Sequence, residues 1–92
     1  MAVYLIQFTK ISPTTDLDKI DEAIKARGNG WFRFFDDSWL INAKVGDTPE
    51  TIAKSLFPLM TNTDHLFVVQ LWSNYYGWLP QEAWDWLNHA AF

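Results

Sequence analysis

Apolar and polar residues along this 92-residue chain follow a pattern that predicts elements in the order β-α-β-β-α-β, followed by one short extra helix. The strands are expected at residues 2–9, 31–35, 39–43 and 65–72. The helices are expected at residues 16–26, from 47 or 48 to a break near 57, and from 80 to about 90. The predicted fold class is therefore α+β.

Residues that cap or break helices mark the ends of these predicted segments. The candidate N-caps are Thr15 or Asp16 for the first helix, and Asp47 or Thr48 for the second. Gly28 suits the C′ position that follows the first helix. Pro58 should kink the second helix or end it near Phe57, because proline lacks the amide hydrogen that a helix needs.

Every predicted strand carries apolar or aromatic side chains on both faces. Two helices on one side of a small sheet cover only one of those faces. The second face needs a cover of its own: another copy of the chain, a partner, or the C-terminal residues 73–92. Six Trp, seven Phe and three Tyr are hard to bury in so small a monomer, which favours association.

The order of the elements also predicts how the strands are arranged. The right-handed crossover preference, applied to two β-α-β units, gives a ferredoxin-like split sheet with the spatial order 4-1-3-2. Strands one and three would be central in that sheet. We expect a single domain over residues 1–92, with residues 73–92 forming an aromatic-rich loop and an extra C-terminal helix.

Composition excludes several classes of function. The net charge of −4 argues against a sequence-independent grip on DNA or RNA, so duplex nucleic acid is not an expected partner. The absence of cysteine excludes disulfides, thiolate metal sites and a cysteine nucleophile, and it suits a reducing cytoplasm. Residues 2–8 lack a basic n-region and contain Gln7, so we expect no signal peptide, and no apolar run approaches the roughly 20 residues of a membrane span.

Aromatic residues are concentrated near the C-terminus, at Trp72, Tyr75, Tyr76, Trp78, Trp84 and Trp86. Such rings can stack on a base or nucleotide. No Lys or Arg follows Lys54, so phosphate groups would find no basic partner in this segment. Tail packing or a dimer interface is therefore the favoured interpretation for Trp84 and Trp86, and we extend it to Trp31 and Trp39.

Basic residues near the strands form a second candidate for ligand binding. Lys10 follows the first strand, and Arg33 lies inside the second between Phe32 and Phe34. A basic residue between aromatic ones is typical of some RNA-binding strands. An arginine on an edge strand also protects that edge against aggregation. The sequence leaves open whether Lys10 and Arg33 share one surface.

Candidate catalytic residues are few. The adjacent pair Asp36 and Asp37 could hold a metal ion or share a proton, although a hairpin turn is the favoured interpretation. His65 and His89 lack any metal-binding spacing. No nucleophile motif around a serine and no glycine-rich phosphate loop is present.

Several short segments carry a resemblance to a known family. They are the opening strand VYLIQF, Gly30-Trp31-Phe32, Ser38-Trp39-Leu40-Ile41, Asn62-Thr63-Asp64 before Leu66-Phe67-Val68-Val69, Gly77-Trp78-Leu79-Pro80, and Ala83-Trp84-Asp85-Trp86-Leu87. Together they resemble the small bacterial and phage proteins labelled SinR-like. Those proteins are in turn similar to the compact ferredoxin-like nucleases of CRISPR adaptation, of the Cas-two type.

The resemblance implies a ferredoxin-like homodimer and, in the nucleases, an aspartate near the end of strand one that holds a divalent metal. This chain has Phe8-Thr9 where Tyr-Asp would be expected, and a threonine hydroxyl is a poor Mg²⁺ ligand. We therefore expect a non-enzymatic homodimeric binding module that needs no cofactor. It would bind a protein partner or a small nucleotide, and in a phage it could inhibit or sequester part of a host defence system.

The alternative hypothesis is a ribonuclease of the Cas-two-like type. It would depend on Mg²⁺ or Mn²⁺ held by Asp36, Asp37 or Asp64 in place of the missing strand-one acid.

Overall fold

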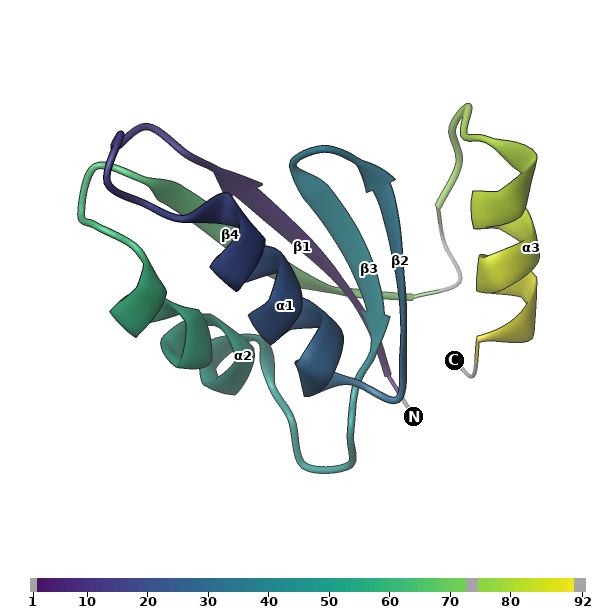
Figure 1. Ribbon diagram of the computed structural model, residues 1–92. Coiled ribbons are helices and arrows are strands. Elements are labelled where there is room, and N and C mark those ends of the chain that lie inside the picture. Colours follow the sequence, from purple (N-terminus) through teal and green to yellow (C-terminus); the bar gives the residue numbers. More distant parts are fainter. Residues whose placement is uncertain (1, 73–74, 91–92) are drawn as a thin grey trace.

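The computed structural model describes residues 2–72 and 75–90 of the chain, and every predicted element is found there within two residues of its expected bounds. The elements in chain order are β1 (Val3–Thr9), α1 (Leu17–Arg27), β2 (Gly30–Phe35), β3 (Ser38–Asn42), α2 (Pro49–Leu56), the 3₁₀ helix η1 (Phe57–Leu59), β4 (His65–Leu71) and α3 (Gln81–His89) (Figure 1). Residues 73–74 and 91–92 of the predicted C-terminal segment lie outside the described residues.

The four strands form one antiparallel sheet in the order β2-β3-β1-β4. This order confirms the predicted one, with β1 and β3 in the centre. Ile6 in β1 lies opposite Trp39 of β3 on one side and Val68 of β4 on the other. Figure 1 shows α1 and α2 together over one face, while α3 stands beyond the β2–β3 side of the sheet. The fold is α+β, as predicted.

The larger hydrophobic core lies between the sheet and the pair α1 and α2. Alternate residues of each strand point to this side, because side chains in a strand alternate between faces. Its fully buried members are Tyr4, Ile6, Phe8, Ile20, Ile24, Trp39, Ile41, Ala43, Ile52 and Leu56. We call this side of the sheet the helix face.

A second, smaller cluster covers part of the opposite side, which we call the open face. Val3 and Leu40 are buried there beneath Leu87 of α3, whose exposed fraction is only 3%. Of the three covers that the sequence left open, the chain's own C-terminal segment therefore supplies at least this one. The cover is partial, because the side chain of Phe67 in β4 is still 64% exposed.

Most of the predicted helix ends are correct. Asp16 caps α1 by accepting hydrogen bonds from two backbone amides of the first turn. Thr48 caps α2 and forms a reciprocal capping box with Thr51. Pro58 ends α2 as expected, because the α-helix stops at Leu56 and the chain continues as one 3₁₀ turn.

The prediction that Gly28 takes the left-handed C′ conformation after α1 is wrong. Its backbone is extended, with φ of −108°, rather than left-handed. A Cβ atom at this position would lie 2.7 Å from the carbonyl oxygen of Asn42. Glycine is therefore required by the close approach of the two backbones, where the chain leaves α1 and enters β2.

No helix in the described part of the chain combines the length and apolar character that crossing a lipid bilayer requires.

Candidate functional site

An apolar hollow lies between the open face and the segment that connects β4 to α3. Its volume is about 140 Å³. The lining residues are Leu5, Phe34, Leu40, Leu71, Tyr75, Tyr76, Gly77, Leu79, Trp84 and Leu87. None of them carries a charge, so the hollow is suited to apolar groups. We call it the tail hollow.

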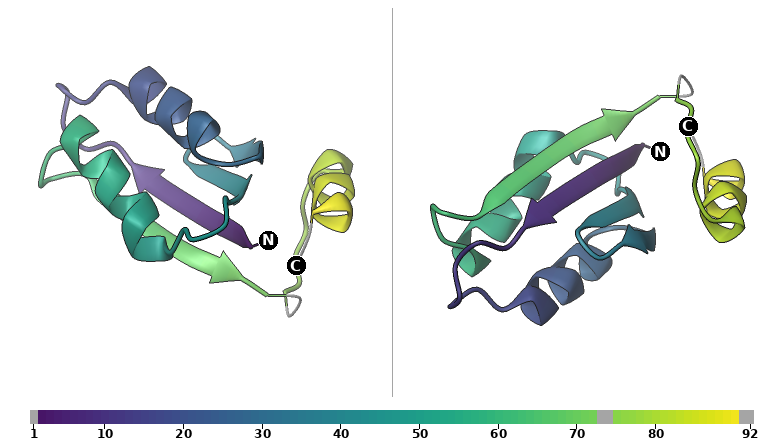
Figure 2. Two further views of the ribbon diagram at one scale, coloured as in Figure 1. Left: turned by 90° about the horizontal axis from the view of Figure 1, so that it is seen from below. Right: turned by 90° about the horizontal axis from the view of Figure 1, so that it is seen from above.

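Three parts of the fold build the tail hollow. Side chains of β1, β3 and β4 that point to the open face form its floor, at Leu5, Leu40 and Leu71. The ring of Tyr75 stacks on Trp84 with centroids 6.2 Å apart, which ties the connecting segment to α3. Figure 2 shows the described part of this segment, residues 75–80, lying beside α3.

The structure brings together some of the aromatic residues that the sequence proposed as ligand-binding. Tyr75 and Tyr76 line the tail hollow, and Tyr76 is fully exposed at its rim. Trp72 and Trp78 are outside the lining set, and their exposed fractions are 67% and 97%. The candidate set is therefore divided between the hollow and the surrounding surface.

The four tryptophans proposed for tail or dimer packing fall into two groups. Trp84 and Trp86 pack against the open-face cluster, as tail packing requires. Trp39 instead lies in the helix-face core, and Trp31 lies under the ammonium group of Lys25, 4.2 Å from its ring centroid. Strand alternation explains the difference, because both residues point to the face that α1 covers.

Arg33 also points to the helix face. Its guanidinium lies 4.8 Å from the centroid of the Trp39 ring and 3.6 Å from a carboxylate oxygen of Asp21. It also donates hydrogen bonds to the carbonyl oxygen of Asp36. These contacts hold Arg33 on the side of the sheet opposite to the tail hollow.

Lys10 lies apart from both groups. It is exposed in the loop after β1, where it lines a surface depression together with residues 13–18. Neither Lys10 nor Arg33 lines the tail hollow, and no other Lys or Arg is among its described lining residues.

Two of the residues proposed as metal ligands, Asp36 and Asp37, have a structural role in the backbone. Asp36 and Asp37 form the two-residue turn between β2 and β3, as the favoured interpretation predicted. The carbonyl oxygen of Asp37 accepts a hydrogen bond of 2.9 Å from the amide of Phe8. Thr9, at the position of the expected metal-binding acid, is exposed. In the described part of the chain, no three His, Asp or Glu side chains converge on a point that could hold a metal ion.

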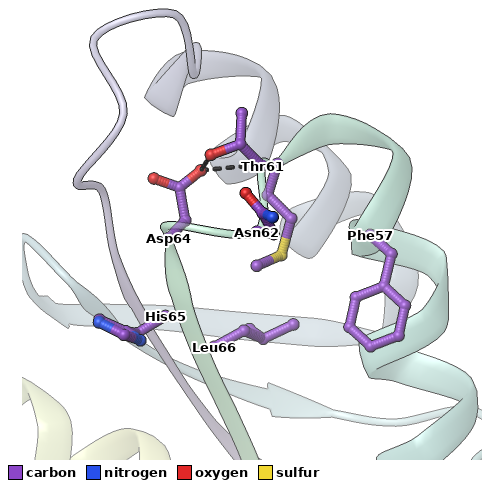
Figure 3. Close-up of a pocket in the computed structure, with 7 residues that line it drawn as sticks. Phe57, Thr61, Asn62, Asp64, His65 and Leu66 are labelled. Carbon is purple, nitrogen blue, oxygen red and sulfur yellow. Dashed lines mark hydrogen bonds between the residues drawn. The ribbon is translucent and has the colours of Figure 1, made fainter.

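A second hollow, of about 440 Å³, lies where η1 leads into β4. Figure 3 shows the carboxylate of Asp64 pointing toward Thr61, while the ring of His65 points away from it. The two residues are neighbours in the chain, but Asp64 precedes β4 and His65 begins it, and their side chains point in different directions (Figure 3). They therefore do not form an acid–base pair.

The Asp64 carboxylate is fully engaged by the protein, and its residue is only 5% exposed. One oxygen accepts hydrogen bonds from the amides of Ile11 and Ser12, at 2.8 and 2.9 Å. The other accepts from the Thr15 hydroxyl and from the amide and hydroxyl of Thr61. This arrangement joins the loop after β1 to the loop before β4.

Two opposing effects act on the pKa of the Asp64 carboxyl. Burial raises it, but the hydrogen bonds from Thr15, Thr61, Ser12 and Ile11 outweigh burial and hold the pKa well below its usual range. The charged carboxylate is thus a structural latch between two loops, with its lone pairs already occupied. The sequence proposed Asp64 only as a metal ligand under the alternative hypothesis, and it could not show this latch because the loop after β1 lies about 50 residues away in the chain.

No protein-family model matches the chain, and no curated protein matches its sequence. The resemblance to SinR-like proteins stays a prediction.

Proposed function

We propose that this protein is a non-enzymatic binding module built on a ferredoxin-like domain, which acts as a homodimer in the cytoplasm of a bacterium or in a phage-infected cell. Its binding site is the tail hollow, and its ligand is an apolar side chain presented by a protein partner. The SinR-like resemblance adds a proposed setting, in which the partner belongs to a host defence system that the protein inhibits or sequesters.

The observation that carries this proposal is the chemistry of the tail hollow. The hollow is open to solvent, uncharged and bordered by aromatic rings that include the fully exposed Tyr76. Exposed apolar surface of this kind is typical of interaction sites. A pocket lined by no Asp, Glu, His, Lys or Arg supports binding rather than catalysis.

A protein ligand fits the hollow better than a nucleotide does. Aromatic rings could stack on a base, but the phosphate group would need a cation or backbone amides. Arg33 is held on the opposite face by Asp21, and Lys10 lies in a distant loop. No Lys or Arg follows Lys54 in the chain.

Binding can be tested by following backbone amide resonances during titrations with two kinds of probe. The probes are N-acetyl-leucinamide and N-acetyl-tryptophanamide for a protein ligand, and adenosine monophosphate for a nucleotide. We expect the acetylated amides to shift the resonances of Leu5, Leu40 and Leu71, because these residues form the floor of the hollow. Shifts caused by the nucleotide instead would overturn the choice of ligand, and no shift with either probe would overturn the site.

A matched pair of variants sharpens this test. Tyr76→Ala removes a ring from the rim of the hollow, whereas Trp78→Ala removes an equally exposed ring that does not line it. We expect only Tyr76→Ala to weaken binding. Equal effects of the two changes would show that the hollow is not the site.

Two further measurements address assembly and catalysis. Native mass spectrometry of the protein as purified should give a dimer without an added mass, while a monomer would contradict the homodimer.

Incubation of the protein with single-stranded RNA and Mg²⁺ or Mn²⁺ should give no cleavage of the RNA. Cleavage that is lost in Asp36→Ala or Asp37→Ala would replace the proposal with the ribonuclease alternative.

A further inference from the structure

The strand β4 forms one edge of the sheet and pairs only with β1. Its seven residues, HLFVVQL, include no Lys, Arg, Asp, Glu, Pro or Gly. Natural proteins usually protect an exposed edge with a charge, a proline, a bulge or a covering segment, because free backbone groups invite another strand. The β4 strand carries none of the first three.

The opposite edge, formed by β2, is protected. It carries Arg33, whose charge is held by Asp21, and the register of its pairing with β3 shifts between Arg33 and Phe35. Helix α3 also contacts β2. The two edges of one sheet therefore differ, and only β4 is left in a state that accepts a further strand.

The backbone groups that β4 offers can be identified from the neighbouring pairs. The amide of Phe8 donates a hydrogen bond to the carbonyl oxygen of Asp37, in the turn before β3. In β1, the backbone N–H and C=O groups of even-numbered residues therefore point to β3, and those of odd-numbered residues point to β4. Gln7 lies opposite Phe67, so the backbone N–H and C=O groups of these two residues hydrogen-bond to each other. The amides and carbonyls of Leu66, Val68 and Gln70 point outward from the edge.

We propose that a second copy of this chain adds its own β4 to this edge, antiparallel and about a twofold axis at Val68. This inference rests on the proposed homodimer and identifies its interface. With the axis at Val68, each copy's Leu66 pairs with Gln70 of the other, which forms about six backbone hydrogen bonds. All the outward groups of the strand are then satisfied.

The side chains of β4 complement themselves in this register. On the open face, Phe67 of one copy lies opposite Val69 of the other, an aromatic and β-branched pair that stabilises antiparallel strands. This contact buries the Phe67 ring, which α3 leaves uncovered. No like charges meet, because the strand has none apart from the ionisable His65 at its start. Self-complementarity is what a twofold interface requires, and it favours a second copy over an unrelated strand.

The assembly has a consequence for the proposed binding site. A twofold axis that pairs antiparallel edges stands perpendicular to the sheet, so the open faces of both copies lie on the same side. The two tail hollows then belong to one continuous surface built on a sheet twice as wide. A partner could engage both hollows at once and gain avidity from them.

A single introduced cysteine tests the register, because the chain contains none of its own. Residues that meet in a hydrogen-bonded antiparallel pair have Cα atoms about 5.5 Å apart, within the range that a disulfide spans. Val68→Cys should therefore form a covalent dimer under mild oxidation. Val45→Cys, at a highly exposed loop position away from β4, is the control and should cross-link far more slowly.

A charge introduced at the edge tests the interface without oxidation. Phe67→Lys changes a side chain that is mostly exposed in the monomer, so the fold should tolerate it. It places two lysines diagonally across the pair, and we expect the dimer dissociation constant to rise by about tenfold or more. Phe35→Lys makes the same change on the other edge and should leave dimerisation unaffected.

Hydrogen exchange gives a direct readout of the added strand. In the dimer, the amides of Leu66, Val68 and Gln70 should be protected, and Phe67→Lys should remove that protection. A dimer in which these amides exchange freely and Val68→Cys does not cross-link would overturn this interface while leaving the homodimer intact. A monomer at every concentration would overturn both.

Discussion

The indole nitrogen of Trp39 donates a hydrogen bond of 2.8 Å to a carboxylate oxygen of Asp21, and this contact fastens α1 to the centre of the sheet. The other carboxylate oxygen lies 2.9 Å from the ammonium group of Lys25. Burial raises the pKa of Asp21, but the hydrogen bonds from Trp39 and Lys25 and the nearby charge of Arg33 outweigh it and lower the pKa. A buried tryptophan thus has its one polar atom satisfied by a charged group.

Removing this carboxylate should destabilise the fold. Asp21→Ala leaves the Trp39 N–H without a partner, and we expect the free energy of unfolding to fall by about 1–3 kcal/mol. Asp21→Asn keeps an acceptor for the indole and should cost less. Urea denaturation measures both, with Glu22→Ala on the exposed side of the same helix as the control. Equal losses in Asp21→Ala and Glu22→Ala would contradict the role of the contact.

The latch at Asp64 leads to a second prediction. Asp64→Asn preserves the size of the side chain but replaces one acceptor oxygen with an NH₂ group that faces hydrogen-bond donors. We expect the thermal midpoint to fall by several degrees, because two loops lose their common partner. Asp36→Asn, at an exposed turn position, should change the midpoint little. An unchanged midpoint in Asp64→Asn would show that the latch contributes nothing.

The lowered pKa values of Asp21 and Asp64 predict how stability depends on pH. A carboxyl whose pKa is lower in the folded state than in the unfolded state stabilises the fold above its ordinary pKa, and this contribution is lost as the pH falls through the folded value. The free energy of unfolding should therefore decline below about pH 4. Urea titrations at pH 7, 5, 4 and 3 measure the decline. It should be shallower in the double variant Asp21→Asn, Asp64→Asn, and an identical slope would contradict the assignment.

The anchor of α3 gives a fourth prediction. Leu87 is nearly fully buried against the open face, so Leu87→Ala should lower the free energy of unfolding by about 2–4 kcal/mol. Asn88→Ala changes the exposed neighbour and serves as the control.

Deleting residues 77–92 should go further and yield aggregated protein, because Val3 and Leu40 lose their cover. A soluble, folded deletion with an unchanged oligomeric state would refute this.

Local patterns in the sequence were sufficient to predict the elements and their order in the sheet. The caps at Asp16 and Thr48 and the break at Pro58 are set by residues within one turn, so they can be identified from neighbouring positions alone. The strand order follows from chain connectivity and the handedness of crossovers. Gly28 was misinterpreted because its constraint is the carbonyl group of Asn42, which is remote in sequence.

The candidate site was less accessible to such reasoning. Strand alternation assigns Arg33 and Trp39 to the helix face only after the register of the hairpin is known. The sequence therefore left the surface of Arg33 open and grouped Trp39 with the residues of tail or dimer packing. The clustering of aromatic residues after Trp72 did indicate where the tail hollow lies. The occupancy of the Asp64 carboxylate could not be foreseen, because its donors come from a loop at the far end of β1.

The central position of β1 has a consequence for the order of events in folding. Residues 3–9 are synthesised well before residues 65–71, yet these two segments are neighbours in the sheet. This central, largely buried strand therefore keeps one side unpaired until β4 has been synthesised. Contacts between such distant segments slow folding and prolong the exposure of apolar surface in aggregation-prone intermediates. We expect nascent chains that end before residue 65 to depend on chaperones.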